Sequence, residues 1–344
     1  MSPGVGTEEH ADRLLAYGVA DPALREAVVL GLADVEAAVH DAVRSADPLA
    51  DDAAGHLVRA GGKRTRPLLC LLAAELGTPG PLVVDAAVVV ELTHLATLYH
   101  DDVIDSATVR RGVPAAQEVW GNTVAILTGD LLFARASVIG ARLGPAAVSI
   151  QARTFERLVL GEMRETVGPR DGEDPVAHYL QVLSDKTGSL IATSARFGGM
   201  FSGLDEATQD VLVRYGDKVG VAFQLADDVL DLAADRADSG KTPGTDLREH
   251  VPTLPVLLLR RAVSAGEAPA GSGDLLDTLD GDLTDDAVLA DTVARLREHP
   301  VTGEARAEAR RWAADAVDAL APLPVSPARD ALAAVAEALA DRTG

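Results

Sequence analysis

Two short acidic motifs of the form Asp-Asp-x-x-Asp are the residues of this sequence best suited to chemistry. They comprise Asp101, Asp102 and Asp105, and then Asp227, Asp228 and Asp231. Each motif ends a long apolar stretch with helical spacing, and on a helix the residues at positions i and i+4 share a face. The first and last carboxylates of each motif are therefore expected to point the same way.

Carboxylates gathered in this way repel one another unless a positive charge lies between them. Hard oxygen ligands of this kind suit Mg²⁺, which usually completes its coordination shell with water and substrate phosphates. In a chain with 53 acidic residues, one such motif could equally be a solvated helix end. Two copies, each preceded by apolar sequence, favour a magnesium site at one end of an apolar cavity.

Basic residues occur where a phosphate group would need them, against a net charge of −22. The turn Gly61-Gly62-Lys63-Arg64-Thr65-Arg66-Pro67 places cations at a predicted helix start, where glycine amides and the helix N-terminus favour anions. Arg110 and Arg111 follow the first acidic motif, and Lys186 and Lys241 come later in the chain. Acidic residues for a metal and basic residues for phosphate together indicate a metal-bridged diphosphate substrate.

Helices are the elements that must position these residues. Asp21-Pro22 and Asp47-Pro48 have the form of a helix N-cap followed by proline at the first helical position. Apolar residues recur at helical spacing, whereas no hairpin dipeptide lies between stretches of alternating apolar residues. We therefore predict an all-α protein. The expected helical segments are 24–39, 66–76, 82–105, 122–143, 145–165, 174–201, 205–235, 286–298, 301–321 and 326–341, and the expected loops are 236–253 and 264–285.

Composition excludes several other classes of protein. The 344 residues are 47% hydrophobic, which excludes a disordered chain, and the acidic balance argues against a nucleic-acid partner. With Cys70 as the single cysteine, an intrachain disulfide or a cysteine-rich zinc site is impossible, and we expect Cys70 in the core. No uninterrupted apolar run approaches the ~18 residues of a membrane span, and residues 1–13 do not resemble a signal peptide. We predict a cytoplasmic protein with no transmembrane segment.

Taken in order, the motifs resemble those of the trans-isoprenyl diphosphate synthases, the polyprenyl synthetase family, and in particular its medium- and long-chain members. The resemblance covers roughly residues 20–260 and implies an isoprenoid synthase type I fold, an all-α helical bundle around a central cavity. It further implies a single domain over 1–344, with C-terminal helices at about 286–341, and a homodimer. It rests on residues 61–67, 91–105, 110–112, 129–130, 186–187, 224–231 and 240–247.

The resemblance also implies a role for each motif residue. Both acidic motifs would form the metal site, with Asp101, Asp105 and Asp227 as direct Mg²⁺ ligands and Asp102, Asp228, Asp231 and Asp246 shaping the metal and water shell. Isopentenyl diphosphate would bind Lys63, Arg66, His94 and Arg111. The allylic diphosphate would bind Arg110, Lys186 and Lys241, while Thr187 and Gln224 would line the site near the developing carbocation.

One position departs from the family pattern. Many members carry a Gly-Lys pair whose lysine lies five residues after the position of Asp246, and this sequence has His250-Val251 there. One cation expected for the allylic diphosphate is therefore missing. Arg248 and His250 are the candidates to replace it.

On this resemblance the chain is a prenyltransferase that condenses isopentenyl diphosphate with an allylic diphosphate by magnesium-assisted ionisation. The product would be an all-trans polyprenyl diphosphate longer than farnesyl, with transient membrane contact when it is released. The alternatives are a geranylgeranyl diphosphate synthase and, in a different class, a non-catalytic subunit of a heteromeric synthase, in which the acidic motifs should be eroded. Terpene cyclases also use an aspartate-rich motif but need no isopentenyl site.

The length of the product gives a first testable prediction. One helical turn rises ~5.4 Å, comparable to one isoprene unit, so the first bulky side chain behind Asp101 would limit the growing tail. The fourth and fifth residues before Asp101 are Thr97 and Ala96, both small. Ala96→Phe should therefore shorten the product without abolishing the first condensation, as measured by chromatography of the dephosphorylated products. An unchanged length would place the limit elsewhere.

Overall fold

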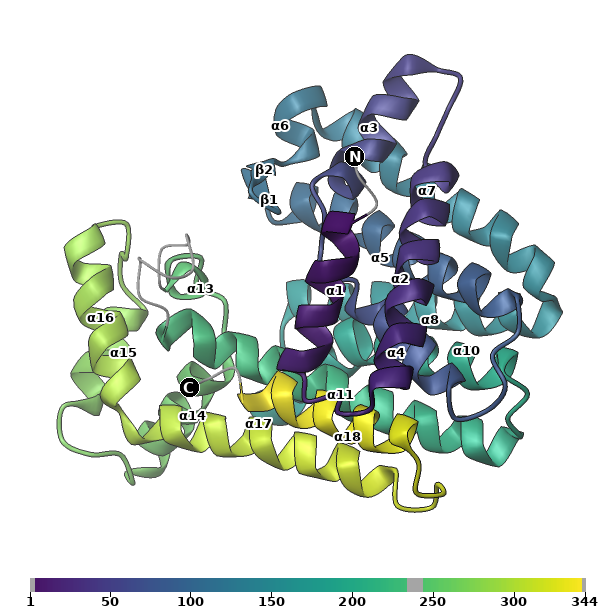
Figure 1. Ribbon diagram of the computed structural model, residues 1–344. Helices are drawn as coiled ribbons and strands as arrows, with labels where there is room; N and C mark the ends of the chain where they lie inside the picture. Colours follow the sequence, from purple (N-terminus) through teal and green to yellow (C-terminus); the bar gives the residue numbers. More distant parts are fainter. Residues whose placement is uncertain (1–3, 234–243, 342–344) are drawn as a thin grey trace. The chain divides into compact units, whose positions relative to one another are not determined.

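The computed structural model describes residues 4–233 and 244–341, which fold almost entirely into helices (Figure 1). The prediction of an all-α protein is confirmed. The elements are α1 (Gly4–Ala16), α2 (Pro22–Ala42), α3 (Pro48–Arg59), α4 (Thr65–Ala74), α5 (Leu82–Ile104), β1 (Val109–Arg110), β2 (Val113–Pro114), α6 (Ala116–Trp120), α7 (Asn122–Leu143), α8 (Pro145–Val167), α9 (Pro175–Leu183), the π-helix η1 (Ser184–Gly188), α10 (Ser189–Phe201), α11 (Glu206–Ala233), α13 (Thr245–Arg248), α14 (Leu254–Ala265), α15 (Ser272–Leu279), α16 (Asp286–Glu298), α17 (Pro300–Ala319) and α18 (Pro327–Ala340).

The described residues form two compact units. The first contains those up to Arg157 together with Ser189–Gly216 and Ala319–Ala334; the second contains Leu158–Gly188 and the described remainder of the chain. The first acidic motif belongs to the first unit and the second motif to the second unit, so the two are described separately. The prediction of one domain over the whole chain stays a prediction.

Helix starts follow the local signals in the sequence. The Asp21 carboxylate accepts a hydrogen bond from the Leu24 amide at 2.8 Å, with Pro22 as the first residue of α2. The Asp47 carboxylate does the same for the Ala50 amide at 2.9 Å at the start of α3. Each bond satisfies an amide that has no partner inside its own helix. The starts of α2 and α3 are therefore set by residues adjacent in sequence.

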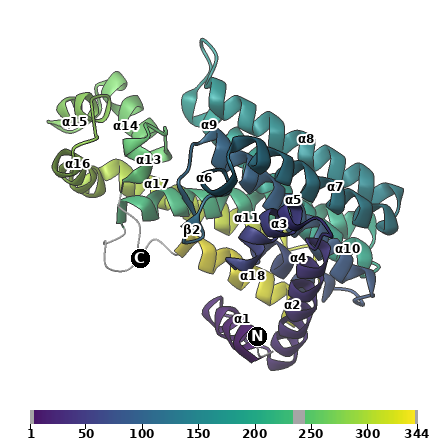
Figure 2. The same ribbon diagram turned by 90° about the horizontal axis from the view of Figure 1, so that it is seen from above.

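The centre of the first unit is α5, which packs against α7, α4, α10 and α2 (Figures 1 and 2). Close approach of α7 requires Gly129, because a Cβ there would lie 3.0 Å from the Ala96 carbonyl oxygen and would overlap the His100 ring. Ala96 is fully buried and Thr97 half-buried, so both proposed chain-length residues lie on the packed part of α5. Cys70, in α4, is also fully buried, as expected, and burial raises the pKa of its thiol to about 12.

An apolar cluster holds the second unit together. It joins the C-terminal part of α11 to α14, α15, α16 and α17, and α14, α15 and α16 lie together in both ribbon views (Figures 1 and 2). Leu225 and Val229 supply the α11 side of this cluster, and both are almost inaccessible to solvent. Burial of this helix face fixes the direction of the second acidic motif, which lies on the same turns.

The segment 264–285 differs from the sequence-based prediction. We expected a loop, but it contains α15, whose Leu275 and Leu279 are buried in the core of the second unit. Glycine and aspartate on both sides of this short helix conceal its apolar periodicity. Its stability comes from burial against other helices, which a local pattern does not reveal.

A small hairpin is a second difference, because the sequence showed no strand signal. Strands β1 and β2 pair in antiparallel register across the two-residue loop Arg111-Gly112. These two residues have φ angles of 54° and 76°. Positive φ at both loop positions is the type I′ geometry, for which Asn-Gly is the usual signal. Because arginine occupies the first loop position, the sequence lacks this signal.

Two helices bear on the expectation of no transmembrane segment. By length and composition alone, α5 and α7 are apolar enough to cross a membrane. The sequence-based criterion was an uninterrupted apolar run, whereas these helices pass a test that allows two charged residues within an 18-residue window. In α5, 67% of that window is buried, and its acidic residues Asp85 and Glu91 pair with Arg142 and Arg64. These are features of a core helix of a globular unit. In α7 the buried share is 33%, and such helices are weak evidence for a span.

Candidate active site

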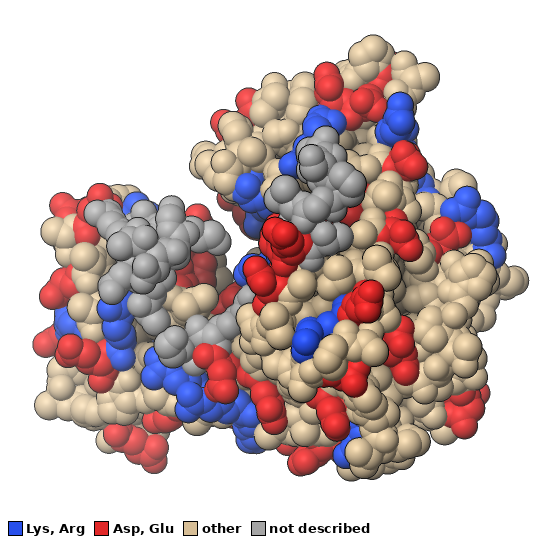
Figure 3. All heavy atoms as spheres, viewed as in Figure 1, with Lys and Arg blue, Asp and Glu red and all other residues tan. Residues whose placement is uncertain are grey.

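Acidic side chains are scattered over the face shown in Figure 3, so surface charge does not by itself mark a site. Burial distinguishes a much smaller set of charged residues. Among the lysine, arginine, aspartate and glutamate residues that the structure describes, the buried ones are Arg64, Glu91, Asp102, Asp185 and Asp228. All five lie within or beside the motifs. Because burying a charge is costly unless it is paired, the partners of these residues define how the site is built.

The three carboxylates of the first motif have different surroundings. Asp102 is fully buried, and its Oδ1 accepts hydrogen bonds from the Arg110 Nε at 2.6 Å and from a terminal guanidinium nitrogen at 2.5 Å. Burial raises the pKa of Asp102, and the charge of Arg110 opposes that shift. Asp101 is half-buried, and Asp105, at the C-terminal end of α5, is exposed. Asp102 thus positions Arg110, while the outer carboxylates are accessible to solvent.

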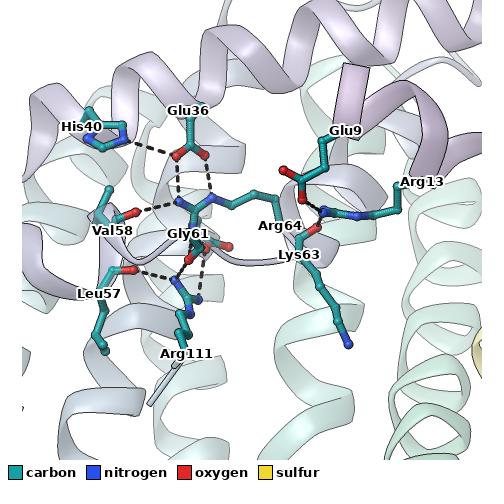
Figure 4. Close-up of polar contacts among 11 residues, drawn as sticks. Glu9, Arg13, Glu36, His40, Leu57, Val58, Gly61, Lys63, Arg64 and Arg111 are labelled. Atoms are coloured by element: carbon teal, nitrogen blue, oxygen red, sulfur yellow. Dashed lines mark hydrogen bonds and ion pairs between the residues drawn. The ribbon is translucent and has the colours of Figure 1, made fainter. Parts of the chain in front are cut away.

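Arg64 is the centre of a buried ion-pair network in the first unit (Figure 4). Its guanidinium donates to both Glu36 oxygens, at 2.6 and 2.8 Å, and to Glu91 at 2.8 Å. Burial acts to lower the pKa of Arg64, but hydrogen bonds and charge from the two glutamates outweigh it and raise the pKa above its usual value. The turn that carries the predicted diphosphate-binding cations is therefore held by α2 and α5.

Arg111 approaches the same network from the hairpin loop (Figure 4). Its guanidinium donates to the carbonyl oxygen of Leu57 at 2.8 Å and to that of Gly61, and it lies 3.9 Å from Glu91. Gly62 makes room for it: a Cβ at Gly62 would lie 2.8 Å from the Arg111 Cζ, and the φ of Gly62 is +147°. The second glycine of the Gly-Gly turn is thus explained by the position of Arg111.

Backbone strain gathers in the motif loops. The described residues other than glycine with positive φ are Arg64 (48°), Ser106 (52°), Arg111 (54°) and His250 (55°). A left-handed conformation costs a residue with a side chain about 1–2 kcal/mol, so surrounding contacts must hold it. Such strain is characteristic of functional sites. In the first unit, the ion pairs of Arg64 and Arg111 are those contacts.

Arg66 and His94 lie in the field of these arginines. Burial lowers the pKa of His94 well below its ordinary value, and the charges of Arg66 and Arg111 act in the same direction, so His94 is neutral near pH 7. Burial lowers the pKa of Arg66 to about 10, against the opposing charge of Glu91. The Arg66 Nε is buried and has no hydrogen-bond partner among the described residues. A guanidinium with a buried donor atom to spare suits an anionic ligand.

The second acidic motif repeats the pattern of the first. Asp228 is buried, and its Oδ2 accepts a hydrogen bond from the Tyr179 hydroxyl. Burial raises the pKa of Asp228 to about 8; the Tyr179 hydrogen bond opposes this shift and the charge of Asp246 adds to it. Asp227 and Asp231 are half-buried. In both motifs the middle carboxylate is held inside the protein, and the outer two are more open to solvent.

Lys186 lies on a π-helical segment of the second unit. It belongs to the π-helix η1, a rare geometry that often occurs at functional sites. Its ammonium pairs with Glu162 at 2.8 Å and with Glu165. Burial acts to lower the pKa of Lys186, but the two glutamates outweigh it and raise the pKa. Lys186 is thus a fixed cation, as a diphosphate ligand would require.

The second unit also contains Thr187, Gln224 and His250. The Thr187 hydroxyl and the Gln224 side-chain oxygen lie 3.5 Å apart, so these two residues are neighbours as their shared predicted role requires. Lys241 lies outside the described residues. His250 stands where many family members have glycine, and its φ of 55° retains the left-handed turn that glycine adopts without strain.

The metal site was tested against the outer carboxylates. Within the parts of the chain that the structure describes, no three His, Cys, Asp or Glu side chains are close enough to share one metal ion. The outer carboxylates are nevertheless hard oxygen donors at accessible helix ends. They fit Mg²⁺, which demands few protein ligands and keeps water and substrate phosphates in its shell. The six aspartates stay predicted ligands.

Several site residues were missed by sequence reasoning. Glu36 and Glu91 hold Arg64, Tyr179 holds Asp228, and Glu165 helps to hold Lys186. Arg64 and Glu91 stand inside the motifs, yet their partnership spans 27 residues, and that of Tyr179 with Asp228 spans 49. For Glu91, a glutamate among apolar residues of a motif-bearing helix was a signal in the sequence.

Comparison with known proteins agrees with the predicted resemblance. The family model described as polyprenyl synthetase matches residues 47–270. A nonaprenyl diphosphate synthase from Mycobacterium tuberculosis is 46% identical over 327 residues, which cover 94% of this chain and 96% of that protein.

Solved structures share the fold. A geranylgeranyl pyrophosphate synthase from Corynebacterium glutamicum, complexed with calcium and isoprenyl diphosphate, matches with a TM-score of 0.82 and 41% identity over 94% of this chain and 98% of that one. A decaprenyl diphosphate synthase from Rhodobacter capsulatus matches with a TM-score of 0.82 and 34% identity over 93% and 98%. The predicted isoprenoid synthase helical fold is confirmed.

The different burial of neighbouring aspartates gives a testable prediction. Asp102→Ala should lower the free energy of unfolding by about 2 kcal/mol or more, because it removes the partner of Arg110; a loss of 3–5 kcal/mol is expected only for fully buried pairs. The Arg110 side chain is 31% exposed, which moderates the loss. Asp101→Ala should cost much less stability. Urea unfolding followed by circular dichroism measures both, and equal losses would contradict the assignment.

Proposed function

Because the chain belongs to the polyprenyl synthetase family, we propose that it condenses isopentenyl diphosphate with an allylic diphosphate to make an all-trans polyprenyl diphosphate longer than farnesyl. One observation carries the proposal. Helix α5 ends in the outer carboxylates Asp101 and Asp105 and also carries His94 and Glu91, which lie among the arginines of the Gly-Gly turn and the hairpin. A single helix thus carries groups predicted to bind metal and groups predicted to bind phosphate, which supports the proposal.

The residues divide the work of the reaction. Lys63, Arg66, Arg111 and neutral His94 would bind isopentenyl diphosphate, and Arg110, Lys186 and Lys241 would bind the allylic diphosphate. Magnesium, when bound, would supply charge that stabilises the diphosphate leaving group. The allylic C–O bond breaks with its electron pair on that group, the isopentenyl double bond forms the new C–C bond, and a proton leaves. Fixed cations favour this charge separation most in the transition state.

The proposed product length has two supports. Ala96 and Thr97 leave α5 without a bulky side chain just before the first motif. The 46% identity to a nonaprenyl diphosphate synthase extends over almost the whole chain. A geranylgeranyl product is the second candidate, because the Corynebacterium glutamicum structure is 41% identical. A non-catalytic subunit is disfavoured, since both acidic motifs are complete.

We further propose that the chain works as a homodimer in the cytoplasm, touching the membrane only as product leaves. Helix α7 exposes Ile126, Leu127 and Val138 on the isolated chain. Exposed apolar groups gathered on one element are typical of an interface between proteins. Light scattering at micromolar concentration should give twice the chain mass, and a monomeric mass would contradict this prediction.

Metal removal tests the proposed reaction. The purified protein should elongate geranyl or farnesyl diphosphate with isopentenyl diphosphate, lose this activity in EDTA and regain it with Mg²⁺. Asp101→Ala and Asp227→Ala should each lower kcat by about 100-fold or more, as expected for lost stabilisation of a developing charge. Radiolabelled product formation measures the rate. Elongation that survives EDTA, or either variant at wild-type turnover, would contradict the metal assignment.

A further inference from the structure

Glu91 stands between the two strained arginines of the first unit. It is 1% exposed, and the same carboxylate oxygen lies 2.8 Å from Arg64 and 3.9 Å from Arg111. Arg64 is the left-handed residue from which α4 begins, and Arg111 is the left-handed residue of the hairpin loop. One buried carboxylate on α5 therefore contacts both the turn before α4, which carries Lys63 and leads into Arg66, and the hairpin loop, which carries Arg111.

The contacts of Arg64 and Arg111 hold the two loops in their left-handed conformations. Arg64 lacks a side-chain cap on α4, so its conformation depends on Glu36 and Glu91. Both Arg64 and Arg111 also donate toward the Gly61 carbonyl oxygen. A further tie comes from α1, since Arg13 donates to the Lys63 carbonyl oxygen (Figure 4). The backbone of the turn is thus held by contacts from the side chains of Arg13, Arg64 and Arg111.

Charge explains why a carboxylate is needed at this point. Arg66 and Arg111 both repel a proton on His94, and each lies within the field of Glu91. Without an anion, guanidinium groups this close would repel each other and move apart, because repulsion is strong where water is excluded. Glu91 supplies that anion before any diphosphate binds. Its hydrogen-bonded oxygen is engaged by Arg64, so it orients the cations and does not itself bind substrate.

We propose that Glu91, together with Glu36 acting through Arg64, is a positioning residue that presets Lys63, Arg66 and Arg111 for isopentenyl diphosphate. This inference rests on the proposed function, which assigns those three residues to that substrate. The network lowers the cost of binding because the strained loop geometry is established in the free protein. It should affect the isopentenyl site and leave the allylic substrate unaffected.

The first experiment is Glu91→Gln, which keeps the shape of the side chain and removes its charge. The KM for isopentenyl diphosphate should rise about tenfold, the effect of one weakened charge-assisted contact, with the KM for the allylic substrate unchanged. Asp85→Asn is the matched control, because Asp85 also lies on α5 and pairs with an arginine, Arg142, at 3.3 Å. It should leave both KM values unchanged. An unchanged KM for isopentenyl diphosphate in Glu91→Gln would overturn the proposal.

A second variant separates positioning from stability. Replacing both members of a buried ion pair by apolar residues usually restores stability. Arg64→Met/Glu91→Leu should therefore recover the Tm lost in Glu91→Gln, while the KM for isopentenyl diphosphate stays raised. Recovery of both quantities would show that the network is only structural. If the Glu91 variants do not fold, Glu36→Gln is the test variant. It should raise the KM for isopentenyl diphosphate about threefold, and an unchanged KM would overturn the proposal.

Calorimetry tests the positioning role of Glu91 independently of the proposed function. Binding of isopentenyl diphosphate to the full chain, without allylic substrate, should weaken about tenfold in Glu91→Gln relative to the wild type. Equal affinities would overturn the positioning role even if the enzyme elongates normally. The wild type could bind isopentenyl diphosphate and yet elongate no allylic diphosphate. That result would overturn the proposed function, and the difference in affinity between the wild type and Glu91→Gln would still test the role of Glu91.

Discussion

Pairing of buried charge is the constraint on which this site depends. A guanidinium or carboxylate removed from water must find a partner of opposite charge, since an unpaired one costs several kcal/mol. Arg64 meets this requirement through Glu36 and Glu91, and those two ion pairs join α2 and α5 to the turn before α4. The loops of the first unit that are predicted to bind diphosphate are consequently positioned by the same contacts that make burial of Arg64 tolerable.

The second unit meets the same constraint with different residues. Tyr179 donates to buried Asp228, and Glu162 and Glu165 hold Lys186 on a π-helical segment. Buried Asp228 and the predicted cation Lys186 thus each have a protein partner that orients them. Orientation of this kind precedes substrate binding, which reduces the reorganisation needed when charge develops in the transition state.

Strain and pairing occur together for a physical reason. Left-handed backbone at Arg64 and Arg111 persists only where other contacts hold it, and the ion pairs with Glu91 provide them. At His250 the same left-handed backbone geometry occurs with a side chain present. The loops of this site therefore keep a shape that their residue types do not favour, as expected where geometry serves binding.

Structural features that depend on residues close together in the chain could be predicted from the sequence alone. Helix caps at Asp21 and Asp47, the apolar period of α5 and the placement of each acidic motif at a helix end follow from residues a few positions apart, and the order of the motifs identified the family. Tertiary structure decided which aspartate of each motif is buried, which glutamates pair with Arg64, and that 272–279 is helical. These outcomes depend on partners that are distant in sequence. Burial determines which residues need such partners, and it arises only when the helices pack.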